Sequence, residues 1–208
     1  MAGSYDFEEQ ERLAELKGWW EDNRWYVVGA IAAAILAFAG YRGWHYWTAS
    51  QAEDAAAMYV GASKAQGQQR LAAVDALVAK HPRSYYASEG QLVVAKEKFD
   101  AGDLPAAEKR LEWVMEHGVD EHRGVARLRL AAVLLEQKKY PEALKVLDAN
   151  KDEAFTALAA DLRGDIMLAQ GRIDEARAAY KLASEKADPR NPVKGIVETK
   201  LNALGGAQ

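Results

Sequence analysis

Residues 160–180 read ADLRGDIMLAQGRIDEARAAY, and this stretch carries the pattern that decides the fold. One apolar-periodic run ends at Gly171, and a second begins at Ile173. Glycine is a favoured residue just after a helix, because it adopts a positive φ without steric cost. The small residues Gly164 and Ala176 would let the two helices approach each other closely. The stretch therefore predicts a helix–turn–helix unit.

The same pattern recurs along the chain. Alanines that align with Ala176 are separated by 34, 36 and 33 residues, in the order Ala73, Ala107, Ala143 and Ala176. We call these four alanines the anchors of the repeat. Another small residue stands 12 positions before each anchor, and a leucine or tyrosine stands four positions after it. These flanking positions are Gly61, Ala95, Ala131 and Gly164 before the anchors, and Leu77, Leu111, Leu147 and Tyr180 after them. The period resembles that of the tetratricopeptide repeat (TPR), a helix–turn–helix unit of about 34 residues.

Such units have to stack, because a single unit cannot bury its own apolar face. Pro105 and Pro141 stand where the first turn of a second helix is expected, a position that tolerates proline. Residues 193–204 predict a terminal capping helix, with an apolar stripe of Val193, Val197, Leu201 and Leu204. We therefore expect an all-α fold in which a TPR-like solenoid with a C-terminal capping helix occupies residues 50–208.

An uncharged segment precedes the repeats. Trp25 to Tyr41 reads WYVVGAIAAAILAFAGY, and a helix that continues to Trp47 would be roughly 34 Å long. That length crosses a hydrocarbon core of about 30 Å. Aromatic residues gather at both ends, as is typical of membrane interfaces. We predict a single transmembrane helix over residues 25–47, with interface residues Trp25, Tyr26, Arg42, Trp44, Tyr46 and Trp47.

Two other interpretations of this segment stay open. Ala37-Phe38-Ala39 before Gly40 matches a signal-peptidase site, but the preceding region is long and acidic, where a signal peptide is short and basic. A buried core helix is the second, because the uncharged run of 17 residues lies just under the usual length of a membrane span, about 18 residues. Aromatic residues at both ends argue against a core helix.

The expected orientation follows from the basic residues near the span. Arg12, Lys17 and Arg24 precede it, whereas only Arg42 follows closely. Excess Lys and Arg mark the cytoplasmic side. We therefore expect residues 1–24 to be an acidic cytoplasmic tail and the repeats to lie on the far side of the membrane.

Two apolar or small-residue stripes accompany the span. Leu13, Leu16 and Trp20 predict an amphipathic helix against the inner membrane surface, with a plain solvated helix as the alternative. Small residues every four positions favour close helix–helix approach in lipid. The predicted membrane-helix packing face is Gly29, Ala33 and Ala37, with ordinary lipid exposure as the alternative.

Several function classes are excluded. The chain has no cysteine, so disulfides and thiolate chemistry are ruled out. The rest of the chain after residue 24 has 24 acids and 24 bases, which leaves no basic footprint for nucleic acid. His117 and His122 are five apart, so they fall on different helix faces. We find no phosphate-binding glycine loop and no nucleophile motif. We predict no enzyme activity, catalytic residue, metal, cofactor or small-molecule substrate.

A protein-binding role is the interpretation that remains. In TPR stacks the first helix of each unit lines the concave face. Counting from the anchors, we predict a binding groove of Leu92, Lys96, Phe99, Leu128, Leu135, Asp161, Asp165 and Leu168. Core packing is an equally good interpretation of the leucines.

Finally, nearly the full length of the chain resembles the YfgM-type ancillary subunits of the SecYEG translocon. The resemblance rests on KGWWEDN at residues 17–23, GWHYW at 43–47, ADLRGD at 160–165 with Gly171 and Ala176-Arg177 after it, and KLNAL at 200–204. The membrane span departs from the family's pattern, because here it is richer in alanine and aromatic residues. The resemblance implies a non-catalytic adaptor of the bacterial inner membrane, with its repeats in the periplasm. Such an adaptor associates with the SecYEG translocon and a membrane-anchored periplasmic chaperone, and assists secreted proteins. An envelope or cell-division scaffold is the alternative.

Overall fold

The computed structural model describes residues 3–150 and 152–205, and within them it consists of helices with no strand. The all-α prediction is therefore confirmed. The chain divides into two units, residues 1–51 and residues 52–208. Helix α1 (Gly3–Lys64) begins in the first unit and ends in the second.

In the first unit, α1 carries a segment that is long and apolar enough to cross a membrane. None of the side chains at residues 25–47 is buried, and Ile31, Ile35 and Phe38 are among the exposed ones. The core helix of a soluble domain would bury such residues. The exposure therefore favours the membrane-spanning interpretation. Leu13, Leu16 and Trp20 are exposed on the same helix.

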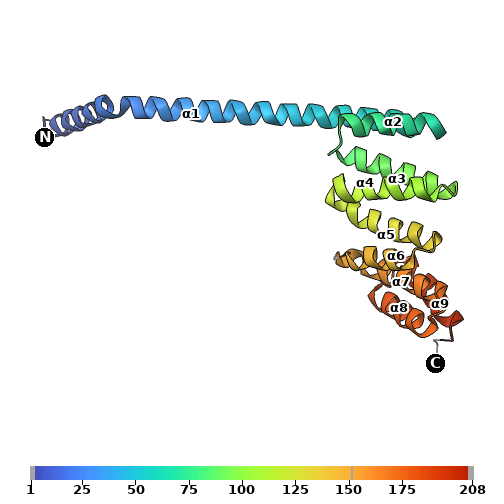
Figure 1. Cartoon of the computed structure of the whole chain (residues 1–208). Helices are drawn as coiled ribbons and strands as arrows, with labels where there is room; N and C mark the ends of the chain where they lie inside the picture. The colour runs from blue at the N-terminus through green and yellow to red at the C-terminus, as the bar shows by residue number, and fades with distance from the viewer. Residues whose placement is uncertain (1–2, 151, 206–208) are drawn as a thin grey trace. The chain divides into compact units, whose positions relative to one another are not determined.

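The second unit is a TPR-like solenoid of helix pairs (Figure 1). The end of α1 pairs with α2 (Gly67–Lys80), α3 (Tyr85–Asp100) with α4 (Leu104–His117), and α5 (Asp120–Glu136) with α6 (Tyr140–Asp148). A 3₁₀ turn at Glu153–Phe155 leads into α7 (Thr156–Ala169), which pairs with α8 (Ile173–Lys186). Helix α9 (Pro192–Ala203) follows. The first helices of successive pairs contact each other, α3 with α5 and α5 with α7.

The turn inside a pair has the same backbone in three of the units. Gly102, Lys138 and Gly171 occupy equivalent positions, and all three have a positive φ, of 76°, 60° and 73°. This left-handed conformation reverses the chain in a few residues. Lys138 adopts it without the freedom of glycine, which costs of order 1–2 kcal/mol. Asp103 then caps α4 by accepting a hydrogen bond from the Ala106 amide at 3.3 Å.

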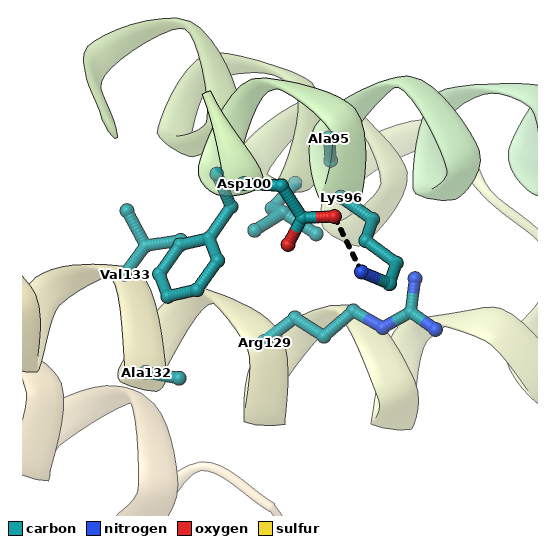
Figure 2. Close-up of a pocket in the computed structure, with 8 residues that line it drawn as sticks. Ala95, Lys96, Asp100, Arg129, Ala132 and Val133 are labelled. Carbon is teal, nitrogen blue, oxygen red and sulfur yellow. Dashed lines mark hydrogen bonds and ion pairs between the residues drawn. The ribbon is translucent and has the colours of Figure 1, made fainter. Parts of the chain in front are cut away.

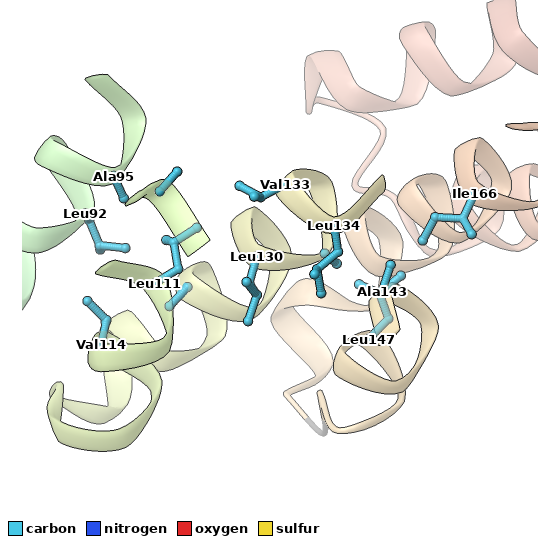
Figure 3. Close-up of a cluster of buried hydrophobic side chains, with 13 residues drawn as sticks. Leu92, Ala95, Leu111, Val114, Leu130, Val133, Leu134, Ala143, Leu147 and Ile166 are labelled. Atoms are coloured by element: carbon cyan, nitrogen blue, oxygen red, sulfur yellow. The ribbon is translucent and has the colours of Figure 1, made fainter. Parts of the chain in front are cut away.

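The alanine anchors pack where their period predicts. Ala107, Ala143 and Ala176 are completely buried, whereas Ala73, in the least regular unit, is only partly buried. The largest core cluster extends from α3 to α7 through side chains such as Leu111, Val133 and Ile166 (Figure 3). Each large buried side chain contributes about 1.5–3 kcal/mol.

Helix α9 closes the far end of the stack. Val197 is completely buried against a cluster that includes Met167 and Tyr180, and Val193, Leu201 and Leu204 pack around it. The predicted stripe is therefore the contact face of a capping helix. Its outer face carries the exposed polar residues Glu198, Thr199 and Asn202, and Ile196 is the large apolar side chain exposed there.

Candidate protein-binding groove

A pocket of about 270 Å³ opens between α3 and α5, the first helices of two neighbouring pairs. Figure 2 shows side chains from both helices turned toward the space between them. The lining residues are Ala95, Lys96, Phe99, Asp100, Leu111, Arg129, Ala132 and Val133.

The floor of the pocket is apolar. Ala95, Leu111 and Val133 belong to the buried core, and Phe99 packs against the same core while staying partly exposed. Because the core side chains hold one another in place, the floor is formed before any partner arrives.

The rim of the pocket is charged. Lys96 and Asp100 form an ion pair of 2.5 Å on one face of α3. Both side chains are more than half exposed, so the pair contributes no more than about 1 kcal/mol. Arg129 of α5 donates a hydrogen bond to the carbonyl oxygen of Leu92 at 3.1 Å. No acidic side chain pairs with Arg129 in residues 9–150 and 152–205, so the rim has two cations and one anion.

The structure brings together only part of the groove that the repeat count predicts. Lys96 and Phe99 both line the pocket. Leu92 lies in the core and is only 3% exposed, so it is not available to a partner, and its prediction as a groove residue is corrected. Its side chain is enclosed because α3 packs against both α4 and α5. Leu128 and Leu135 are partly buried against the core, and Leu168 is exposed.

The two predicted groove acids are engaged within the chain. Lys200 of α9 lies 2.8 Å from a carboxylate oxygen of Asp161 and 2.8 Å from one of Asp165. The phenol of Tyr180 donates a second hydrogen bond to Asp165 at 2.7 Å. The repeat count placed these acids in the binding groove, and in the structure they pair with the capping helix.

The pKa values in this cluster follow from burial and from its charge count. Burial raises the pKa of Asp161, and the hydrogen bond from Lys200 offsets only part of that effect. Burial also raises the pKa of Tyr180, and its hydrogen bond to Asp165 raises it further. Burial alone would lower the pKa of Lys200, but the bonds to two carboxylates outweigh it and raise the value. Two carboxylates hold the Lys200 ammonium in its charged form, whereas burial dominates the pKa of Asp161 because one shared ammonium compensates it only in part.

Sequence reasoning missed the residues that α5 contributes. Arg129 follows Leu128, which the repeat count placed in the groove, and the pocket is lined by Arg129, Ala132 and Val133 instead. The available signal was the position of Arg129 inside the apolar run LRLAAVLL at residues 128–135. A charge in such a run has to reach solvent or a partner.

The predicted membrane residues are all on α1. Gly29, Ala33 and Ala37 are exposed and fall on one face of the helix. The six predicted interface residues are exposed too, and the Trp44 and Trp47 rings lie 5.5 Å apart. Contact with lipid or a partner helix stays a prediction for both groups.

His117 and His122, which were considered as metal ligands, lie in different environments. His122 is buried and lies 3.2 Å from Glu89, whereas His117 is half exposed and stacks on Trp113. In the part of the chain that the structure describes, no three potential metal ligands lie together.

These features define a class: TPR-like helical-repeat proteins that carry an N-terminal helix able to span a membrane. The chain matches a family of tetratricopeptide repeat-like domains over residues 17–206. It is 32% identical to the ancillary SecYEG translocon subunit of Neisseria gonorrhoeae, with 95% of this chain and 97% of that protein covered. It is 30% identical to the subunit of the same name from Haemophilus influenzae, covering 97% of this chain and 100% of that protein, and 29% identical to the one from Escherichia coli, covering 94% and 96%. The chain belongs to the family of ancillary SecYEG translocon subunits. No solved structure matches it.

Proposed function

We propose that this protein is a non-catalytic adaptor of the Sec translocon, anchored in the bacterial inner membrane and binding partner proteins through the pocket between α3 and α5. The observation that carries the binding role is the preformed apolar floor beside Arg129, a cation without an acidic partner in the described residues. The relatives, which are named as ancillary SecYEG translocon subunits over almost their whole length, support the choice of partner.

The proposed layout has three parts. Residues 1–24 are the cytoplasmic tail, residues 25–47 cross the membrane, and residues 50–208 are in the periplasm. The excess of basic residues before the span supports this orientation. In this layout the pocket faces the compartment into which translocated chains emerge.

The finer part of the proposal concerns secreted proteins. We infer that the adaptor assists them together with a membrane-anchored periplasmic chaperone, as the family resemblance implies. A partly exposed aromatic residue in a concave surface suits this role, because segments of an unfolded chain offer apolar side chains that have not yet been buried.

Site-specific crosslinking in living cells tests the proposal. p-Benzoylphenylalanine replaces Phe99 or Ala132 in the pocket, and Leu182 on α8 serves as an exposed control outside it. After irradiation, the protein is purified in a mild detergent and its crosslinked partners are identified by mass spectrometry. We expect Sec channel subunits to co-purify, and crosslinks to a partner or a secreted chain at the two pocket positions only.

Two results would contradict the proposal. Co-purification of cell-division or peptidoglycan proteins in place of Sec subunits would favour an envelope scaffold. Equal crosslinking at position 182 and at the pocket positions would show that the pocket is not the binding surface.

A further inference from the structure

We propose that the pocket between α3 and α5 recognises a polypeptide segment in which one apolar side chain stands next to a carboxylate. This inference rests on the proposed function, because it names the chemistry of the partner that the same pocket would bind.

The size of the pocket limits the occupant. Pockets for small organic ligands usually have about 300–1,000 Å³, and this one has about 270 Å³. It opens between α3 and α5, so one side chain of a polypeptide can enter it. The floor of Ala95, Leu111 and Val133 with Phe99 beside it offers no side-chain hydrogen-bond donor or acceptor. An apolar side chain the size of leucine or phenylalanine fits that chemistry.

The charge of the rim selects what accompanies the apolar side chain. Guanidinium presents five N–H donors in a planar fork that matches the two oxygens of a carboxylate. The hydrogen bond to the Leu92 carbonyl uses Nη1 of Arg129 and holds the group at the pocket. The other N–H groups make no hydrogen bond to protein in residues 9–150 and 152–205, and they can receive a carboxylate.

The neighbouring charges agree with this choice. Lys96 already has a partner in Asp100, so the rim without Arg129 is neutral. Arg129 therefore provides the excess positive charge that an acidic group would meet. A basic segment would bring like charge against Arg129, and an uncharged apolar segment would cover the guanidinium without replacing the water it loses. Both are disfavoured relative to a segment with a carboxylate.

Peptide binding to the full-length protein in nanodiscs tests the inference. Three fluorescent glycine–serine peptides carry one leucine each. In the first, leucine is the last residue and has a free carboxylate; in the second, the same end is amidated; in the third, glutamate follows leucine before an amidated end. Fluorescence anisotropy gives the Kd of each peptide for the parent and for two variants. Arg129→Gln removes the guanidinium, and Arg123→Gln, earlier on the same helix and paired with Asp120, is the matched control.

We expect the first peptide to bind the parent about tenfold more tightly than the amidated one, as a charge-assisted hydrogen bond predicts. Arg129→Gln should abolish that preference, and Arg123→Gln should keep it. If the third peptide binds as tightly as the first, a side-chain carboxylate is sufficient; if it binds like the amidated one, the chain end is recognised. Circular dichroism and thermal melting establish that both variants are folded.

Equal binding of the acid and amide peptides by the parent would overturn the inference, as would a carboxylate preference that survives Arg129→Gln. The proposed function has a separate readout. Sec subunits crosslinked at position 99 with no carboxylate effect would leave the adaptor role standing and reject only this chemistry. A preference for the carboxylate peptide without crosslinked Sec subunits would support this chemistry and reject the adaptor role.

Discussion

The ammonium of Lys200, on the last helix, lies 2.8 Å from a carboxylate oxygen of Asp165, which is on α7 and 35 residues earlier in the chain. Tyr180 of α8 donates a hydrogen bond to the same carboxylate. One acid therefore connects all three C-terminal helices, and the end of the solenoid depends on a polar cluster as well as on its apolar core.

Replacing Lys200 tests that cluster. Lys200→Met leaves Asp161 and Asp165 partly buried without their cation, and we expect a loss of about 1–3 kcal/mol of unfolding free energy. Urea unfolding followed by circular dichroism measures it. Lys181→Met, at an exposed lysine on α8, is the control and should change stability by less than about 0.5 kcal/mol. Equal midpoints for the two variants would show that the cluster does not hold the cap.

The contact between Gly164 and Tyr180 gives a second prediction. A Cβ at residue 164 would overlap the buried Tyr180 ring, whereas a Cβ at Gly195 on α9 would meet nothing. We expect Gly164→Ala to destabilise the protein by about 1–3 kcal/mol through overpacking. Gly195→Ala should stabilise it by about 0.5–1 kcal/mol, because glycine in a helix interior is unfavourable. Thermal unfolding of both variants checks the opposite signs, and a shift in the same direction would refute the packing argument.

Glu108 predicts a pH dependence of stability. Its partial burial acts to raise the pKa, but hydrogen bonds from Gln137 and Lys139 outweigh it, so the pKa falls below its ordinary value of 4.5. A carboxyl with a lowered pKa stabilises the fold above that ordinary value, and the contribution disappears as the pH falls through the lowered one.

We therefore expect Glu108→Gln to be less stable than the parent by about 0.5–1.5 kcal/mol at neutral pH. The difference should shrink as the pH is lowered below 4.5, the ordinary value for this group. Urea midpoints over a pH series measure it. Glu112→Gln, one turn further along α4 at an exposed position, should show little difference at any pH. A stability difference between the parent and Glu108→Gln that stays constant with pH would contradict this explanation.

The proposed topology is open to a labelling test, because the chain has no native cysteine. Gln10→Cys and Gln69→Cys place single thiols at exposed positions on the two sides of the predicted span. In spheroplasts, a membrane-impermeant maleimide should label residue 69 and spare residue 10 until detergent is added. Labelling of residue 10 but not residue 69 would show the opposite orientation. A mature chain that begins at Gly40 would show a cleaved signal peptide.

The small-residue face of α1 can be tested in the membrane. Ala33→Leu enlarges the centre of the face formed with Gly29 and Ala37, and we expect it to weaken association with another membrane helix because the backbones can no longer approach closely. A genetic reporter of transmembrane helix association measures the effect. Ala39→Leu, on another face, is the control. Equal association by both variants would mean that this face contacts only lipid.

The helix pairs could be predicted because their signals are local. Gly102 and Gly171 end helices at the predicted turns, the alanine anchors are buried in three of the four units, and the stripe through Val197 packs as a cap. The groove was only partly predictable. Lys96 and Phe99 line the pocket, whereas Leu92 is a core residue. Counting along a repeat gives a residue's place in its unit, but not how far the helix is rotated about its axis.

The sequence by itself determined that this protein is a stack of helix pairs behind an apolar N-terminal segment, because helix period, turn glycines and small anchors act between residues that are close in the chain. Only the tertiary structure decided which charges are already paired and which can meet a partner. Lys200 reaches back 39 residues to Asp161, and Arg129 reaches back 37 residues to the carbonyl of Leu92. Such contacts depend on how whole helices rotate to bury their largest side chains, so two acids that resemble a binding surface instead hold the cap, and an arginine in an apolar run faces the groove.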